Sequence, residues 1–198
     1  VAWWLRTPGF AWGEDDAAYL LLAKELRHFS YRDVQEVLAP VHARFPPLFP
    51  LMLAVVGAPV GDHLDVLLAF VALMSAGALL FFFAATRRAL GDDVALASLV
   101  LAAINPGSLW MGGNLMAEAP FAFFTMLAVW ALTREDEGPV FSWIAGASVY
   151  LAALTRTAGV VFVVGLFLYW VVQRRFRRAA LFGSLAVVTI AAWLAWTF

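Results

Sequence analysis

The stretch LDVLLAFVALMSAGALLFFFAAT, residues 64–86, decides the fold class of this chain. About 20 consecutive apolar residues suffice for an α-helix to cross the hydrocarbon core of a bilayer. The stretch reaches that length with one charged residue, Asp65, near its beginning, and Arg87 and Arg88 follow it directly. It therefore predicts a membrane-spanning helix that ends at a membrane surface.

The composition of the whole chain also indicates a membrane protein. Hydrophobic residues make up 64% of the chain and charged residues 14%, and the mean hydropathy is +0.84. These values lie far outside the range of soluble proteins. The formal net charge of −1 gives no reason to expect a nucleic-acid partner. The absence of cysteine from this sequence excludes disulfides and thiolate metal sites within it.

Five further apolar segments follow the first one. Together they predict an all-α polytopic membrane protein with about six transmembrane helices and an extracytoplasmic loop that carries interfacial amphipathic helices. Residues 1–62 form this loop and residues 63–198 the bundle. We expect a partial module of a longer protein, because Val1 is no initiator and Phe198 lies inside an apolar run. The further segments are residues 94–110, 115–133, 141–155, 157–172 and 179–198.

Basic residues give the predicted bundle an orientation. Lysine and arginine prefer cytoplasmic loops, so we place Arg87, Arg134 and the arginine-rich run 174–178 in the cytoplasm and the N-terminal region outside. Arg156 interrupts the apolar residues 141–172. Two short helices that turn at Arg156 on the outer side cost less than one long helix with an unpaired cation at its middle. We expect an integral protein of a bacterial plasma membrane.

Aromatic residues support the predicted span ends. Tryptophan is enriched at both membrane–water interfaces, where its ring lies at the level of the lipid headgroups. Four tryptophans near the predicted ends are therefore interpreted as interface anchors, namely Trp110, Trp130, Trp143 and Trp170.

Three consecutive acids, Glu14, Asp15 and Asp16, stand at the start of a helix predicted over residues 15–29. Tyr19 and the apolar residues spaced after it fall on one face, so we expect the helix to lie flat on the bilayer with this face down. The acids have two interpretations. They cap the first turn of the helix, or they act chemically at the membrane surface, where carboxylates near lipid are costly. For Asp15 and Asp16 the sequence favours neither interpretation.

The segment VHARFPPLFP, residues 41–50, connects this helix to the bundle. Three prolines within five residues are expected to exclude a regular helix and to fix an extended backbone. Residues 51–60 are apolar but too short to cross a bilayer, which predicts an interfacial piece. His42 and the other two histidines lack metal-ligand spacing, so we expect them at the surface and predict no metal site.

Glu118 and Arg156 are the ionisable residues near the outer ends of the predicted spans. They have two interpretations that stay open. The two side chains pair with each other across two helices, or Arg156 holds an anionic ligand, because a guanidinium matches phosphate oxygens bidentately.

Five motifs of this sequence resemble those of GT-C glycosyltransferases, and most of all the branch of protein O-mannosyltransferases and bacterial aminoarabinose or related sugar transferases. The resemblance covers nearly the whole chain and includes the first extracytoplasmic loop of that family. It implies a donor sugar carried on a polyprenyl phosphate and an acceptor, protein or lipid or glycan, outside the cytoplasm. The motifs are GEDDAAY (13–19), AKEL (23–26), RFPPLFP (44–50), EAPF (118–121) and LTR (154–156).

The resemblance assigns roles to residues at matching positions. An acid shortly before the tyrosine acts at the catalytic centre of that family, which implies Asp15 first and Asp16 second. A second family carboxylate often precedes a proline directly, whereas Glu118 is one residue removed from Pro120. The catalytic candidates are Asp15, Asp16 and Glu118, and the substrate-binding candidates are Arg156, Arg44, His42 and Tyr19.

The chemistry of such a transfer fits these residues. Glycosyl transfer from a lipid phosphate needs a base for the acceptor hydroxyl and a cation for the leaving phosphate, which we assign to Asp15 and Arg156. No cofactor is implied beyond the donor substrate and the membrane lipid, and the need for a divalent metal stays open. The alternative is a polytopic transporter or a lipid-linked-sugar flippase, which also uses intramembrane charges.

Overall fold

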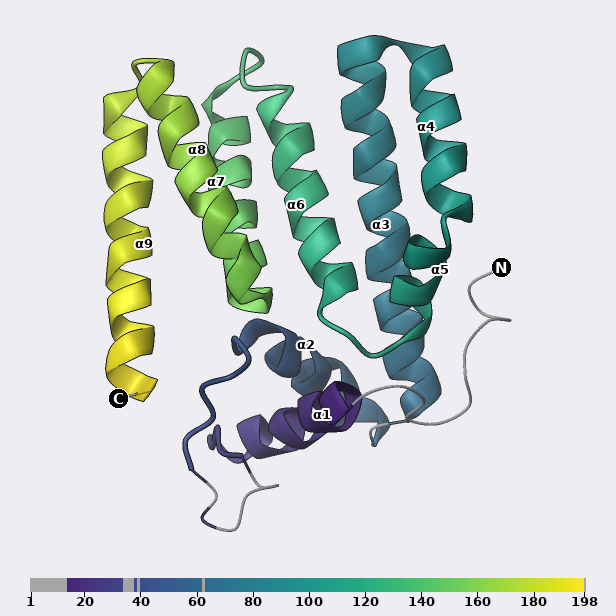
Figure 1. Ribbon diagram of the computed structural model, residues 1–198, viewed down its shortest axis with the longest axis vertical. Coiled ribbons are helices and arrows are strands. Elements are labelled where there is room, and N and C mark those ends of the chain that lie inside the picture. Colours follow the sequence, from purple (N-terminus) through teal and green to yellow (C-terminus); the bar gives the residue numbers. More distant parts are fainter. Residues whose placement is uncertain (1–13, 34–37, 39, 62, 198) are drawn as a thin grey trace.

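The computed structural model describes residues 14–33, 38, 40–61 and 63–197, and these residues are mainly helical (Figure 1). The predicted all-α class is confirmed. Among the described residues the regular elements are helices, and β-type pairing is limited to one isolated bridge between Arg32 and Val41. The helices are α1 (Glu14–Arg27), α2 (Leu48–Gly57), the 3-10 turn η2 (Ala58–Val60), α3 (Leu64–Leu90), α4 (Asp92–Ile104), α5 (Pro106–Gly113), α6 (Glu118–Leu132), α7 (Pro139–Thr155), the 3-10 turn η3 (Thr157–Gly159), α8 (Val160–Val172) and α9 (Phe176–Thr197).

The helices α3 to α9 stand side by side as a bundle, and α1 and α2 lie across one end of it (Figure 1). We call this the α1–α2 end. The opposite, far end carries the connections between α3 and α4, α6 and α7, and α8 and α9. Ion pairs join these connections, because Arg88 contacts Asp136 at 3.0 Å and Arg175 contacts Glu135. The basic residues that we assigned to one side of the membrane therefore share one end of the molecule.

Two apolar cores hold the bundle together. At the α1–α2 end, Phe49 and Leu53 of α2 pack with Leu67 and Val71 of α3, and all four are fully buried. Toward the far end, a second core forms around Trp170 of α8, which is also fully buried. The first core is the one that positions α1 and α2 against the bundle.

The predicted segment 94–110 is broken rather than straight. It forms α4 and α5, which are bent by 60° relative to each other at Asn105 and Pro106. Pro106 lacks the N–H that would continue α4, and the side chain of Asn105 accepts a hydrogen bond of 2.8 Å from the backbone N–H of Gly107. An N-cap asparagine followed by proline is a strong helix start, so α5 begins anew.

Among the described residues, α3 alone is long and apolar enough by itself to cross a membrane, and α4 with α5 qualifies as one bent span. The helices α6, α7 and the η3–α8 pair are apolar but shorter. The predicted count of about six spans is therefore not confirmed and stays a prediction.

Two expectations about the N-terminal region were wrong. The apolar face of α1 does not lie free for lipid, because Tyr19, Leu22 and Ala23 are buried and α1 packs against α2. The prolines also do not exclude a helix, since α2 begins at Leu48 and includes Pro50. A proline in the first turn is tolerated because its missing N–H would have had no partner there.

Candidate functional site

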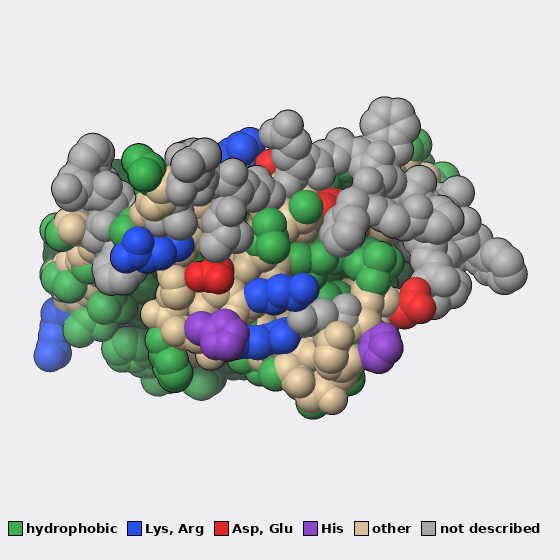
Figure 2. Space-filling model, turned by 90° about the horizontal axis from the view of Figure 1, so that it is seen from below, with side chains coloured by type: hydrophobic (Ala, Val, Ile, Leu, Met, Phe, Trp, Pro, Cys, Tyr) green, Lys and Arg blue, Asp and Glu red, His purple; other side chains and the backbone are tan. Residues whose placement is uncertain are grey.

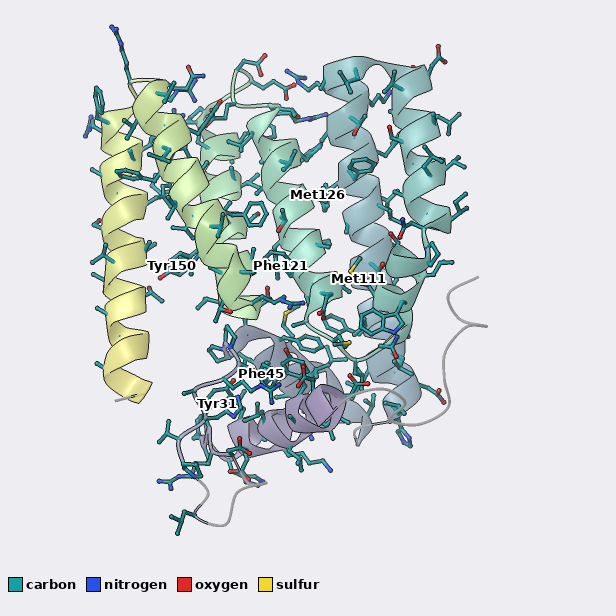
Figure 3. The ribbon with its side chains drawn as sticks, in the orientation of Figure 1. Tyr31, Phe45, Met111, Phe121, Met126 and Tyr150 are labelled. Atoms are coloured by element: carbon teal, nitrogen blue, oxygen red, sulfur yellow. The ribbon has the colours of Figure 1, made fainter. Side chains whose placement is uncertain are left out.

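Tyr19 is the centre of the candidate site. It lies on α1 with its side chain buried, and its ring packs at 4.6 Å from the ring of Phe45 and 4.9 Å from the ring of Phe49, measured between centroids. Phe45 lies in the part of the proline segment (residues 41–50) that precedes α2, and Phe49 lies within α2, so Tyr19 of α1 packs against both. Phe45 is labelled at the α1–α2 end in Figure 3.

Asp15 and Arg44 form an ion pair beside this aromatic group. An Nη atom of Arg44 lies 3.2 Å from a carboxylate oxygen of Asp15, and both side chains are partly exposed. The guanidinium of Arg44 also lies over the ring of Phe45, 5.0 Å from its centroid. Asp15 is therefore reachable from outside and is held next to a cation that the proline segment supplies.

Asp16, the next residue, has a different environment. It is buried, with 7% of its surface exposed, and no hydrogen bond joins its carboxylate to another described residue. Burial, together with the negative charges of Asp15 and Glu118, raises the pKa of Asp16 to about 6. A carboxylate with a pKa near neutrality in a polar cluster is typical of a functional position.

Glu118 and Arg156 form an ion pair across two helices. Glu118 lies in the first turn of α6, and Arg156 is the extended residue that ends α7, with φ −145° and ψ 139°. The predicted turn at Arg156 is thus confirmed. A methyl group on Gly159 would lie 2.5 Å from the Cα of Ala153, so this turn brings two backbones into direct contact.

Four charged side chains lie close enough to Tyr19 to act on the pKa of its hydroxyl. Burial and the charges of Glu118 and Asp15 raise the pKa of the Tyr19 hydroxyl, while Arg156 and Arg44 act in the opposite direction. Six of the seven predicted site residues therefore share one region, which we call the charged cluster: Asp15, Asp16, Tyr19, Arg44, Glu118 and Arg156. Figure 2 views the molecule from this end, where acidic, basic and histidine side chains lie among apolar ones.

His42 is the seventh predicted residue and lies beside the cluster. It is buried with 3% of its surface exposed, so the expectation of a surface histidine was wrong. Its Nε2 atom accepts a hydrogen bond of 3.0 Å from the backbone N–H of Phe45, and its Nδ1 lies 3.3 Å from a carboxylate oxygen of Asp33. His42 thus fixes the loop that carries Arg44 and Phe45.

An apolar cavity of about 130 Å³ adjoins the turn at Arg156. Pro46 and Pro47 line it on one side, and residues of α7, α8 and α9 line the other. Tyr150, labelled in Figure 3, belongs to this lining and donates a hydrogen bond of 3.3 Å to the carbonyl of Leu185 on α9. The arrangement sets an apolar space beside the turn that carries Arg156.

Sequence analysis did not predict which residues line this cavity, and it did not identify the role of one acid at the far end. Glu135 is a buried hub that accepts hydrogen bonds from the side chains of Ser142, Tyr169, Trp170 and Arg175. It lies in an acidic loop whose sequence indicates only a solvated turn. Trp170 is fully buried, so its assignment as an interface anchor was wrong.

No group of three or more metal-ligating side chains occurs among the residues that the structure describes. Comparison with known families finds one that matches residues 44–196, described as Dolichyl-phosphate-mannose-protein mannosyltransferase. The match extends over more than half of the 198 residues. Neither the curated proteins nor the solved structures contain a match to this chain.

Proposed function

Because this chain belongs to the dolichyl-phosphate-mannose-protein mannosyltransferase family, we propose that it moves a sugar from a polyprenyl-phosphate donor to an extracytoplasmic acceptor. Membership makes it a glycosyltransferase of the GT-C type, embedded in a membrane. The donor, the acceptor and the acting residues are the proposal. The observation that carries it is the charged cluster next to the apolar cavity.

In the proposed reaction Asp15 is the base. It takes the proton of the acceptor hydroxyl while the acceptor oxygen forms a bond to the anomeric carbon of the sugar. The bond from that carbon to the phosphate oxygen breaks, and polyprenyl phosphate leaves with the bonding pair. Asp15 suits this role because it is partly exposed and an acceptor can reach it.

Arg156 stabilises the leaving phosphate in this proposal. Its guanidinium has five N–H donors, and the ion pair with Glu118 is made through Nη1. With about 40% of its side chain exposed, the guanidinium retains donors for phosphate oxygens. Glu118 then orients Arg156, so the pairing of the two side chains and the binding of an anion by Arg156 are compatible. Arg44 adds a second cation at the same end.

The apolar cavity beside Arg156 is the proposed entry for the polyprenyl tail. Its lining is almost entirely apolar, and it lies between helices of the bundle rather than in the N-terminal loop alone. A lipid phosphate held at Arg156 therefore has an apolar path for its first isoprene units. Tyr19 and His42 hold the two sides of the α1–α2 end in place around this site.

The proposal includes about six spans and an extracytoplasmic charged cluster. The helices α3, α4 with α5, α6, α7, η3 with α8, and α9 correspond in order to the six predicted segments. A positive far end in the cytoplasm follows from the preference of arginine for that side.

The test uses the full-length protein in membranes, offered a panel of polyprenyl-phosphate sugars and separated acceptor pools. We expect transfer from at least one lipid-linked sugar and its loss in Asp15→Asn. Arg174→Gln, which changes an exposed charge at the far end, is the control and should keep activity. Movement of the lipid-linked sugar across the membrane without transfer would instead support the flippase alternative.

A further inference from the structure

We propose that the far end of the bundle holds a binding site for an anionic phospholipid, with its phosphate on Arg177 and Arg178. The site is a cavity of about 220 Å³ lined by Ser142 and Trp143 of α7 and by Arg177, Arg178, Leu181 and Phe182 of α9. It lies at the end of the molecule opposite the charged cluster. This lipid site depends on the bundle lying in a membrane, but it does not depend on the proposed transfer reaction.

The cationic wall of this cavity is held in place before any ligand arrives. Arg178 donates to the hydroxyl of Ser142, and its Nη1 also lies 3.4 Å from a carboxylate oxygen of Glu135. Glu135 is anchored in turn by Trp170, whose Nε1 donates a hydrogen bond of 3.0 Å. A guanidinium fixed in this way loses little side-chain entropy when it binds a phosphate.

The local charge favours an anion. Four arginines stand between residues 174 and 178, and Glu135 is the carboxylate that pairs with two of them, Arg175 and Arg178. Within the described part of the chain, Arg177 and Arg174 make no ion pair. Arg177 lines the cavity, whereas Arg174 does not, so the cavity has one cation without a protein partner.

The remaining lining is apolar and fits an acyl chain. The ring of Phe182 lies 5.4 Å from the ring of Trp143 and 4.9 Å from the ring of Trp170. Gly146 permits this close packing, because a methyl group there would lie 2.1 Å from the Phe182 ring. Leu181 and Trp143 are each about half exposed beside it. A crevice with arginines at the bundle end and aromatic walls below suits a phospholipid with its headgroup at the membrane surface.

An anionic phospholipid is favoured over a free phosphate because half of the lining is apolar. A small anion would use the two arginines and leave Trp143, Leu181 and Phe182 without a partner. Zwitterionic lipids carry a phosphate as well, but their positive headgroup meets the positive field of the run 174–178. The proposed ligand is therefore a glycerophospholipid with net negative charge.

The experiment compares the full-length protein in nanodiscs of phosphatidylcholine with nanodiscs that also contain phosphatidylglycerol. We expect the anionic lipid to raise the melting temperature by about 3 °C or more, since a ligand stabilises the state that binds it. Arg177→Gln should lose at least about half of this rise. Arg174→Gln is the matched control, because it removes the same charge three residues away outside the cavity, and it should keep the rise.

Native mass spectrometry gives a second readout that does not depend on unfolding. The wild-type protein and Arg174→Gln should retain a bound phosphatidylglycerol, and Arg177→Gln should lose it. Equal losses in both variants would mean a diffuse surface charge and would overturn the site. The same thermal rise with inorganic phosphate in phosphatidylcholine nanodiscs would overturn the lipid assignment.

Discussion

At the α1–α2 end Asp16 is buried without a hydrogen-bond partner among the described residues, whereas at the far end Glu135 is buried with several donors around it. The consequences for the two carboxyl groups are opposite. Burial and neighbouring acids raise the pKa of Asp16 to about 6. Burial also acts to raise the pKa of Glu135, but hydrogen bonds from Ser142, Trp170 and Tyr169 and the charge of Arg175 outweigh it and lower the pKa.

The two environments correspond to two different roles for a buried acid. A buried carboxylate that is saturated with donors is held in one ionisation state and one position, which is what a structural hub needs. A buried carboxylate without donors keeps its capacity to take a proton and to respond to a ligand. The partners of a buried acid, rather than its burial alone, therefore separate the two roles.

The largest expected effect concerns the two ends of the bundle, which we expect on opposite sides of a membrane. Lys24 of α1 and Arg174 beyond α8 are both exposed, and the sequence has no cysteine of its own. We expect Lys24→Cys in intact cells to react fully with an impermeant thiol reagent and Arg174→Cys to react only after permeabilisation. Labelling of both positions from the same side would show that the two ends do not lie on opposite sides of the membrane.

The next largest effect is on catalysis. Asp15→Asn keeps the size of the side chain but removes the base, so transfer should fall by about 100-fold or more while expression stays near normal. Glu135→Gln, the matched amide substitution at the far end, should reduce folded yield more than turnover of the folded protein. Initial rates per folded molecule separate the two outcomes. An Asp15→Asn protein with most of its activity would leave Asp15 as a helix cap.

Removal of the hub should have the largest effect on stability. Glu135→Ala leaves Arg175 and Arg178 without their carboxylate and should destabilise the fold by about 3 kcal/mol. Because the pKa of Glu135 is lowered in the folded state, the stability that it contributes is present above the ordinary carboxyl pKa and is lost as the pH falls through the lowered value. Thermal melts of wild type and variant should therefore converge in acid. Equal melting at neutral pH would contradict the hub role.

A smaller effect distinguishes a phosphate-binding Arg156 from a purely structural one. Arg156→Lys keeps the charge but loses the planar fork, so it should fold normally and turn over about tenfold more slowly. Arg156→Ala and Glu118→Gln are measured beside it for activity and melting temperature. A large loss of stability in Arg156→Ala that Glu118→Gln restores in the double variant would show a pair with a structural role only.

The smallest expected effect is a change in pH dependence. The pKa of Asp16 is raised to about 6, so a negative charge appears beside the proposed base as the pH rises through that value, and the rate of transfer should increase over the same range. Asp16→Asn should remove this increase with pH. At higher pH its turnover should stay within about tenfold of wild type.

The stability of the fold should change with pH in the opposite direction to the rate of transfer. The raised pKa of Asp16 means that its contribution to stability is present below its ordinary value and is lost as the pH rises through about 6. Asp16→Asn should therefore melt about 2 °C higher at pH 8. An unchanged pH profile and melting curve would remove the contrast with Glu135.

Much of this molecule follows from local sequence patterns. The bounds of α3, α7 and α8 lie close to the apolar runs that predict them, and the turn at Arg156 follows from the cost of an unpaired cation in a span. The gathering of Asp15, Arg44 and Arg156 at one end follows from the order of the helices. Periodicity and charge placement are local signals, and these features depend on little else.

What the sequence could not predict depends on contacts between distant segments. The partner of the apolar face of α1 is α2, some thirty residues later, and nothing in the α1 pattern distinguishes a protein surface from lipid. Asp15 and Asp16 differ because Asp16 is buried, whereas Asp15 is partly exposed and pairs with Arg44 of a later segment. Trp170 resembles an interface anchor by its position, but Glu135, from a different loop, accepts its N–H and buries it.

The turn that brings Arg156 to the charged cluster depends on the absence of one carbon atom. Gly159 lies so close to Ala153 that a methyl group would reach 2.5 Å from its Cα. An alanine at this position would change no charge and remove no hydrogen-bonding side chain, yet it would force α7 and α8 apart just where Arg156 emerges. Position 159 therefore fixes where Arg156 lies relative to the charged cluster, and a substitution there would displace Arg156 without altering any charged or hydrogen-bonding side chain.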